Sequence, residues 1–274
     1  MLDPRLTPAR ADLAAAHLRG KVVAPRFVEG RPAGIVAASA PLQRRPEPSA
    51  PWETEALHGE SATIYDERDG FAWVQLERDG YVGYLASSAL GAPVAATHRV
   101  AALRTHAYPG PSIKLPHVLA LSLGARLGIL AQAGDFLIDG EGRHFWARHL
   151  APVASVEADF VAVAEKFEHC PYLWGGRTSE GIDCSGLTQA ALTAAGIAAP
   201  RDSDMLEKLG APVSGALQRG DLMFWKGHVG VMTDPETLLH ANGHRMAVVR
   251  EPLAAAQARI AASGGGAITS MRRL

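Results

Sequence analysis

Residues Tyr172–Leu187 read YLWGGRTSEGIDCSGL, and this stretch carries the strongest chemical signal in the chain. Gly175, Gly176 and Gly181 predict a loop whose backbone can approach other groups closely. Asp183 is a preferred N-cap residue and predicts a helix that begins near Cys184. A thiol at a helix N-terminus meets the positive end of the helix dipole, which favours the nucleophilic thiolate. The local sequence therefore makes Cys184 a candidate nucleophile.

Two histidines are candidates for the base that such a nucleophile needs. His228 begins the apolar stretch HVGVM, and His240 lies in LLHAN, twelve residues later. This separation fits two antiparallel strands joined by the turn at residues 234–236. His228 would then take the Cys184 proton, and His240 would hold the other ring nitrogen of His228.

Other roles for these residues stay open at this point. A free cysteine is commonly a small buried hydrophobe, which is the role expected for Cys170. Each histidine alone is more often a hydrogen-bonded structural residue. One cysteine with two histidines also suits zinc, although the closely spaced ligand pairs typical of zinc sites are absent from the sequence.

The C-terminal part, residues 155–274, is expected to form one α+β domain. Apolar residues at helical spacing predict a helix over 156–167, and a second helix is expected over 183–195. Strands are expected at 221–225, 228–233, 237–241 and 247–249. Helices followed by a run of strands favour an antiparallel sheet.

The N-terminal half has the pattern of small β-barrels. Residues 1–50 are expected to be an extension ending in a linker, because residues 42–51 contain three prolines. Short strand-like runs around an Asp-Gly turn predict a first barrel over 51–95. A related block of strands and polar turns predicts a second barrel over 96–154.

Composition excludes several classes of protein. The 274 residues carry a net charge of −1, which argues against a nucleic-acid partner. Two cysteines cannot make a disulfide scaffold. The first twenty residues lack the apolar core of a secretory signal, and no apolar run is long enough for a membrane helix. We therefore expect a cytoplasmic protein, monomeric and without a membrane partner.

The motifs together resemble the NlpC/P60 family of papain-like cysteine peptidases. The family pattern Tyr-x-Trp-Gly-Gly, Asp-Cys-Ser-Gly-Leu, Gly-His-Val-Gly and a later His is present in order at residues 172–176, 183–187, 227–230 and 240. The resemblance implies a papain-like catalytic domain, with Cys184 as nucleophile, His228 as base and His240 as the third member. It also implies that Tyr172 donates a hydrogen bond to the developing oxyanion.

Further site residues follow from a narrower resemblance, to γ-D-glutamyl-L-diamino acid endopeptidases of the dipeptidyl-peptidase VI type. Residues 200–205 (PRDSDM) are similar to a stretch whose Asp binds the free amine of L-Ala, which implies that role for Asp202, with Ser203 beside it. The N-terminal half resembles the bacterial SH3 (SH3b) domains of these enzymes. This implies that Glu60, in Leu-His-Gly-Glu, and Tyr81 or Tyr84 help to close the amine pocket. Trp174 and Ser185 are expected to line the substrate cleft.

The resemblance implies hydrolysis of the γ-D-Glu–L-diamino acid bond in muropeptides such as L-Ala-γ-D-Glu-diaminopimelate or its Lys counterpart. No metal or organic cofactor is expected, and the setting would be recycling of wall peptides. Three alternatives share the fold: an exported wall-lytic endopeptidase, an acyltransferase or amidase, and a non-catalytic wall-binding protein. The last would be expected to lack a catalytic Cys or His, yet all three positions are filled.

Overall fold

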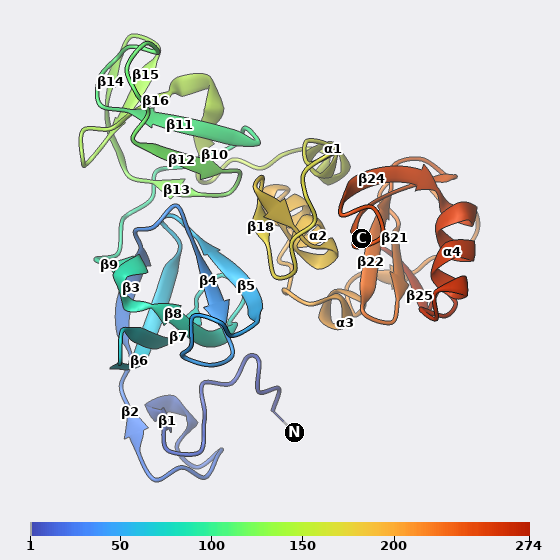
Figure 1. The fold of residues 1–274 in the computed structure, drawn as a ribbon, viewed down its shortest axis with the longest axis horizontal. Coiled ribbons are helices and arrows are strands. Elements are labelled where there is room, and N and C mark those ends of the chain that lie inside the picture. Colours follow the sequence, from blue (N-terminus) through green and yellow to red (C-terminus); the bar gives the residue numbers. More distant parts are fainter. Residues whose placement is uncertain (1) are drawn as a thin grey trace. The chain divides into compact units, whose positions relative to one another are not determined.

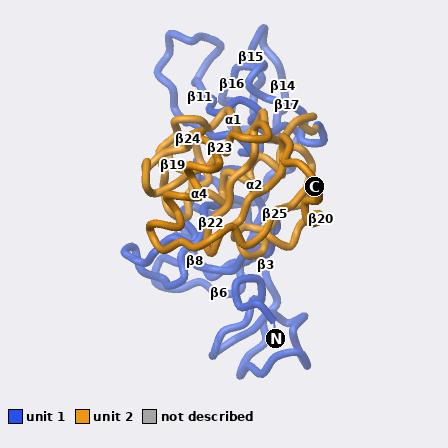
Figure 2. Tube along the Cα trace, turned by 90° about the vertical axis from the view of Figure 1, so that its right-hand side faces the viewer, with its two compact units in different colours: residues 1–155 blue, residues 156–274 orange. Residues whose placement is uncertain are grey.

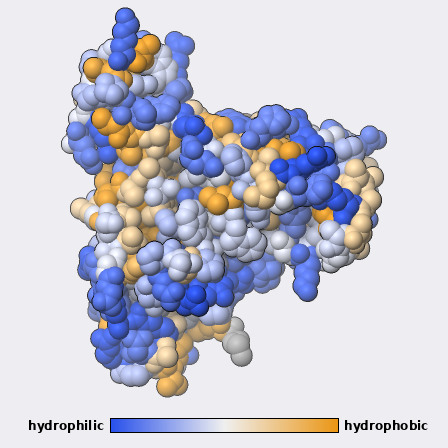
Figure 3. All heavy atoms as spheres, viewed as in Figure 1, coloured by the Kyte–Doolittle hydropathy of each residue, from blue (hydrophilic) through white to orange (hydrophobic). Residues whose placement is uncertain are grey.

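A computed structural model describes residues 2–274 of the chain. The chain forms two compact units, residues 1–155 and residues 156–274 (Figure 2). Within the described residues, the α-helices all belong to the second unit, whereas the first is built of strands and short 3-10 helices (Figure 1). None of the helices in residues 2–274 has the length and apolar character needed to cross a membrane. Hydrophobic side chains are interspersed with hydrophilic ones on the face shown in Figure 3.

Unit 1 contains two β-barrel-like bodies preceded by a small N-terminal body. The N-terminal body has β1 (Ala14–Ala15), a 3-10 helix (Ala16–Leu18) and β2 (Phe27–Val28). The first barrel has β3 (Arg31–Ile35), β4 (Ser39–Gln43), β5 (Trp52–Leu57), β6 (Ser61–Arg68), β7 (Phe71–Leu76), β8 (Val82–Ala86), a 3-10 helix (Ser87–Ala89) and β9 (Leu90–Gly91).

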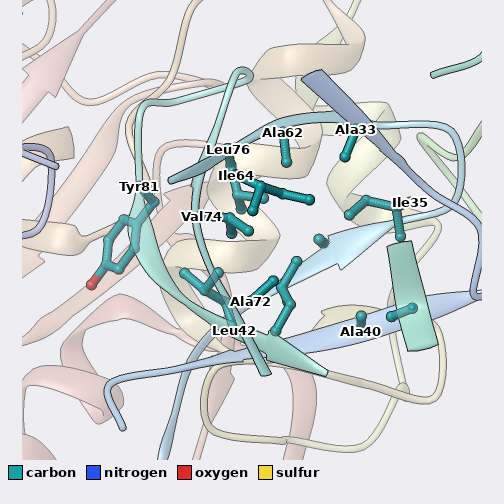
Figure 4. Packing of buried hydrophobic residues seen from close by; sticks show 13 residues of the cluster. Ala33, Ile35, Ala40, Leu42, Ala62, Ile64, Ala72, Val74, Leu76 and Tyr81 are labelled. Atoms are coloured by element: carbon teal, nitrogen blue, oxygen red, sulfur yellow. The ribbon is translucent and has the colours of Figure 1, made fainter. Parts of the chain in front are cut away.

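The first barrel is a seven-stranded sheet in the order β5-β4-β8-β7-β6-β3-β9. Alternate residues of its strands point inward, as expected for strands with one buried face. Leu42, Ile64, Val74 and Leu76 meet in the resulting core, where all are nearly inaccessible to solvent (Figure 4). Tyr81 borders this core with its hydroxyl directed away from the other labelled side chains (Figure 4).

The first barrel begins earlier than the sequence predicted. β3 and β4 lie before residue 51, so residues 44–51 are the loop between β4 and β5 rather than a linker between domains. The three prolines of residues 42–51 were misleading because they all lie in this loop, and a proline-rich loop has the same composition as a linker. A further proline, Pro41, lies inside β4 and is tolerated because β4 meets its second neighbour, β8, at the Gln43–Tyr84 pair alone.

The second barrel-like body spans residues 98–152 and has two sheets. Its elements are β10 (His98–Val100), β11 (Arg104–Tyr108), β12 (Leu119–Ser122), β13 (Arg126–Leu127), β14 (Ile129–Ala133), β15 (Phe136–Asp139), β16 (His144–Trp146), a 3-10 helix (Ala147–His149) and β17 (Leu150–Pro152). The sheet orders are β13-β10-β17 and β12-β11-β16-β15-β14. Val100, Leu121 and Phe145 lie at the centre of its core.

Unit 2 is the α+β domain that the sequence predicted, with an antiparallel sheet in the order β20-β25-β21-β22-β23-β24. The strands of this sheet are β20 (Ala211–Pro212), β21 (Leu222–Trp225), β22 (His228–Met232), β23 (Thr237–Asn242), β24 (Ala247–Pro252) and β25 (Ser270–Arg273). The unit also has a separate two-stranded sheet of β18 (Arg177–Thr178) and β19 (Gly181–Ile182). The helices of unit 2 are α1 (Phe160–Glu165), α2 (Cys184–Ala194), α3 (Ser203–Leu206) and α4 (Leu253–Ala262).

The first helix of unit 2 is shorter than the predicted 156–167. Asp159 caps it by accepting a hydrogen bond from the Val161 amide at 2.8 Å, so the helix begins at Phe160. Helix α2 agrees closely with its prediction and packs against β22, with Leu192 and Val231 in one apolar cluster. This packing brings the start of α2 to the sheet that carries the two candidate histidines.

Candidate active site

Helix α2 begins at Cys184, where the sequence predicted it. Asp183 is its N-cap, and the Asp183 carboxylate accepts hydrogen bonds from the amides of Gly186 at 2.6 Å and Gly175 at 2.9 Å. The glycine loop is packed directly onto this turn, since a Cβ on Gly186 would lie 2.5 Å from the Gly176 carbonyl oxygen. The loop glycines therefore allow the close approach that seats Cys184 at the helix start.

A buried arginine, Arg201, binds this helix start. Arg201 has a side chain that is 1% exposed, and its guanidinium donates to both carboxylate oxygens of Asp183, at 2.9 and 2.6 Å. It also donates to the Ser185 hydroxyl at 2.7 Å. The Ser185 hydroxyl is thus engaged inside this network, which corrects its assignment as a residue that lines the substrate cleft.

Burial has the largest effect on the pKa of the Cys184 thiol. Cys184 is 8% exposed, and its burial, with the nearby Asp183 carboxylate, raises the pKa of the thiol to about 12. A hydrogen bond from the Val229 backbone and the charge of Arg201 act in the opposite direction without reversing the shift. Burial therefore opposes the thiolate that the helix start was expected to favour, and the thiol requires a base.

His228 and His240 meet as the hairpin prediction requires. His228 Nε2 lies 2.7 Å from His240 Nδ1, and the ring centroids are 5.0 Å apart. Burial, together with the neighbouring His240, lowers the pKa of His228 to about 3, so its imidazole is neutral at pH 7 and able to accept a proton. Cys184 lies against the Val229 backbone, directly beside His228 in β22.

The polar contacts of His240 extend further than sequence reasoning foresaw. Its Nε2 lies 2.7 Å from Glu251 Oε1 and 2.9 Å from Asn242 Nδ2. A hairpin register was the signal that would have found Glu251. If His240 pairs with Val249 across the Asn242–Ala247 turn, Glu251 falls diagonally beside His240 on the same face of the sheet.

Two aromatic residues of the motif occupy different surroundings. Tyr172 pairs with Ile182, two residues before the nucleophile, and burial, with the electrostatic effects of Cys184 when ionised and of Asp183, raises the pKa of its phenol. The phenol therefore keeps its proton at pH 7 and remains a hydrogen-bond donor. Trp174 is 66% exposed, so its ring is accessible to a ligand.

Asp202 and Ser203 lie at the start of α3, next to the buried Arg201. Asp202 occupies the N-cap position, but its side chain makes no capping hydrogen bond. Its charge interacts with Arg201, and the residue is partly exposed. Helix capping by its side chain is therefore excluded, and amine binding by Asp202 stays a prediction.

Glu60 and Tyr81, two of the substrate-binding residues predicted from the first barrel, have different surroundings. Glu60 is buried: Oε2 accepts the Leu57 amide at 2.9 Å and Oε1 is ion-paired with Arg78 at 2.9 Å. This carboxylate holds a barrel turn, which corrects its assignment to substrate binding. The Tyr81 hydroxyl lies 3.4 Å from Glu53 Oε2, so Glu53, which is also ion-paired with Arg44, is the acid beside that tyrosine. Tyr81 in substrate binding stays a prediction.

No group of three or more His, Cys, Asp or Glu side chains in residues 2–274 has the arrangement needed to hold a metal ion. The polar groups of the site instead form a directed series of proton donors and acceptors. A neutral thiol at the start of α2, against the backbone of Val229, which follows His228, is suited to nucleophilic attack assisted by His228 as a general base held by His240.

The contact between the two histidines depends on a glycine in β22. A Cβ on Gly230 would lie 3.1 Å from the His240 Cβ and 2.8 Å from a Leu238 methyl group. We expect Gly230→Ala to displace the His240 ring, lowering kcat/KM by about tenfold to a hundredfold and stability by about 1–3 kcal/mol. Gly243→Ala, in the turn between β23 and β24, is the control, since its Cβ would meet nothing within 4 Å. Equal activity of the two variants, measured by peptide hydrolysis, would contradict the expectation.

Similarity to known proteins agrees with this geometry. The model of the bacterial dipeptidyl-peptidase SH3 domain matches residues 42–90, and that of the NlpC/P60 family matches residues 169–260. Dipeptidyl-peptidase 6 of Lysinibacillus sphaericus is 33% identical over 100 residues, covering 35% of this chain and 36% of that protein. Gamma-D-glutamyl-L-lysine dipeptidyl-peptidase of Bacillus cereus is 25% identical over 229 residues, covering 69% of this chain and 67% of that protein.

A solved structure shows the same fold. The crystal structure of an NlpC/P60 family protein from Bacillus cereus superposes with a TM-score of 0.74 at 22% identity, covering 89% of this chain and 99% of that one. The matched region spans about a third of the length of the Lysinibacillus relative and two thirds of the Bacillus one. Residues 42–90 of this chain therefore match a bacterial SH3 domain, and residues 169–260 match the NlpC/P60 family.

Proposed function

We propose that this protein is a cysteine peptidase that hydrolyses the γ-D-Glu–L-diamino acid bond of peptidoglycan peptides. The observation that carries the proposal is the placement of Cys184 at the start of α2, beside the strand whose His228 is hydrogen-bonded to His240 at 2.7 Å. A nucleophile, a base and an orienting group in this relation are the parts of an acyl-transfer site.

In the proposed reaction the Cys184 sulfur attacks the γ-carbonyl carbon of D-Glu while His228 takes the thiol proton. The carbonyl oxygen becomes an oxyanion, which the Cys184 amide and the Tyr172 phenol would stabilise. The C–N bond then breaks, and His228 passes its proton to the departing amine of the diamino acid. Water, deprotonated by the same imidazole, releases the acid and restores the thiol.

We further propose a preference for short peptides with a free N-terminal L-Ala. Two features support this: the partly exposed Asp202 carboxylate beside the site, and the relatives named dipeptidyl-peptidases. A carboxylate contributes affinity for an ammonium group that it loses for an acetylated amine. Such peptides arise when wall fragments are broken down, so the proposed role is recycling of wall peptides in the cytoplasm.

One assay tests the substrate preference. The full chain is incubated with L-Ala-γ-D-Glu-meso-diaminopimelate or with its N-acetyl form, and products are identified by mass spectrometry. We expect cleavage of the free-amine peptide into L-Ala-γ-D-Glu and diaminopimelate, at least tenfold faster than cleavage of the acetylated one. Asp202→Asn should reduce this difference mainly by raising KM for the free-amine peptide.

The possible outcomes separate the two levels of the proposal. Equal cleavage of both peptides would remove the amine preference while leaving a peptidoglycan peptidase. Cleavage of neither, by protein whose fold is intact by circular dichroism, would count against the substrate class. Transfer of the L-Ala-γ-D-Glu group to an added amine in place of water would identify an acyltransferase.

A further inference from the structure

The polar contacts of the histidine pair continue onto a carboxylate that the proposed triad does not use. Glu251 lies in β24, diagonal to His240 in β23, and its Oε1 is 2.7 Å from His240 Nε2. Arg259 of α4 forms an ion pair with the same carboxylate oxygen. His240 is fully buried, so its ring cannot exchange these partners for water.

The charge of Glu251 decides which nitrogen of His240 carries the proton. Burial alone would raise the pKa of Glu251, but hydrogen bonds from His240 and Arg259 outweigh it and hold the pKa below its usual value. An ionised carboxylate only accepts hydrogen bonds, so His240 Nε2 must carry the proton and donate. The other nitrogen, Nδ1, is then an acceptor.

The tautomer of His240 in turn determines the tautomer of His228. Its Nε2 lies 2.7 Å from His240 Nδ1, and an acceptor at that distance requires His228 Nε2 to carry a proton. A neutral imidazole has one N–H, so His228 Nδ1 keeps its lone pair. That lone pair is what the Cys184 thiol needs in order to transfer its proton.

Asn242 favours the opposite tautomer of His240, so Asn242 and Glu251 compete to determine which ring nitrogen carries the proton. Its Oδ1 accepts the Arg245 amide at 2.8 Å, which turns its Nδ2 toward His240 Nε2, at 2.9 Å. An amide nitrogen only donates, so Asn242 alone would stabilise His240 with an unprotonated Nε2. His228 would then carry its proton on Nδ1 and be unable to act as the base. The bond to an ionised carboxylate is the stronger of the two.

We propose that Glu251 is a positioning residue that sets the tautomers of His240 and, through it, of His228, against the bias of Asn242. The inference deepens the proposed peptidase reaction and rests on it for its catalytic meaning. The proton assignment itself stands on the contacts between the four side chains and can be measured without a substrate.

The first test is nitrogen-15 NMR of the full chain labelled at histidine. In the wild-type protein we expect both His228 and His240 as Nε2–H tautomers at pH 7. Glu251→Ala should convert both largely to Nδ1–H, while Glu251→Gln, whose amide oxygen can still accept from His240, should keep the original tautomers. Unchanged tautomers in Glu251→Ala would overturn the proposal, and this result does not depend on whether any peptide is cleaved.

The second test uses turnover of L-Ala-γ-D-Glu-meso-diaminopimelate. Glu251→Ala should lower kcat by about tenfold to a hundredfold with KM within twofold, the size of effect seen for partners that orient a functional imidazole. Glu251→Gln should lose less. Glu168→Gln is the matched control. Glu168 is ion-paired with Arg250, which precedes Glu251 in β24, and it is not a partner of His228 or His240.

Rescue separates positioning from support of the fold. Asn242→Asp places a carboxylate where the amide nitrogen lies, 2.9 Å from His240 Nε2. The double variant Glu251→Ala/Asn242→Asp should recover most of the lost kcat and the Nε2–H tautomers. Restored tautomers without restored kcat would overturn the role in turnover, and failure to restore either would mean that Glu251 acts on the fold. A wild-type protein that cleaves no peptide would refute the peptidase function, leaving the tautomer result valid.

Discussion

Replacing Cys184 by Ala is expected to lower peptide hydrolysis by roughly ten-thousand-fold or more, the loss typical when the nucleophile of a catalytic triad is removed. The sulfur is the only group in the site that forms the proposed covalent intermediate, so no neighbouring side chain can take its place. The fold should be retained, because Ala is a good helix former at the start of α2 and loses only one buried sulfur. Single-turnover kinetics should show no thioester.

The chain supplies a matched control in its other cysteine. Cys170 is likewise not in a disulfide and is 8% exposed, the same fraction as Cys184, but it is not at a helix start. Cys170→Ala should keep activity within about twofold, because substitutions away from the reacting groups leave transition-state binding unchanged. Near wild-type activity of Cys184→Ala would refute the proposed mechanism, whereas loss of activity in both variants would point to a disturbed fold.

The catalytic region was predictable because its signals are local in sequence. Asp183, a preferred N-cap residue, predicts that a helix begins at Cys184. Two short apolar runs around an Asp-Pro turn predict the hairpin that carries His228 and His240. Each prediction needed only contiguous residues and a known backbone period. The α+β class followed from the same signals, since helices followed by strands favour an antiparallel sheet.

Other features depend on contacts that no local pattern encodes. Arg201 lies 18 residues beyond its partner Asp183, and its burial follows only from the way α3 is placed beside α2. The true start of the first barrel was hidden because the three prolines of residues 42–51, which lie in the loop between β4 and β5, have the composition of a linker. The thiol pKa depends on how completely the surrounding chain covers Cys184, which composition does not reveal.

The buried pair of Arg201 and Asp183 gives the largest expected effect on stability. Arg201→Met would leave the Asp183 carboxylate buried without its cation, a change that typically costs about 3–5 kcal/mol. Methionine fills much of the same volume, so the loss should come from the charge rather than from a cavity. Urea titration followed by NMR signals of residues 156–274 measures this unit without interference from the other.

Two comparisons separate the buried pair from ordinary ion pairs. Arg219 also bonds two acids, Asp159 and Glu165, but its side chain is 39% exposed, so Arg219→Met should cost at most about 1 kcal/mol. Adding Asp183→Asn to Arg201→Met removes the stranded charge while keeping a side chain that can cap α2, so the double variant should be more stable than Arg201→Met. A double variant that is less stable would show that Asp183 stabilises the helix start mainly through its own charge. Because the same carboxylate seats the first turn of α2, loss of stability in Arg201→Met should be accompanied by loss of turnover, with the nucleophile no longer held beside His228.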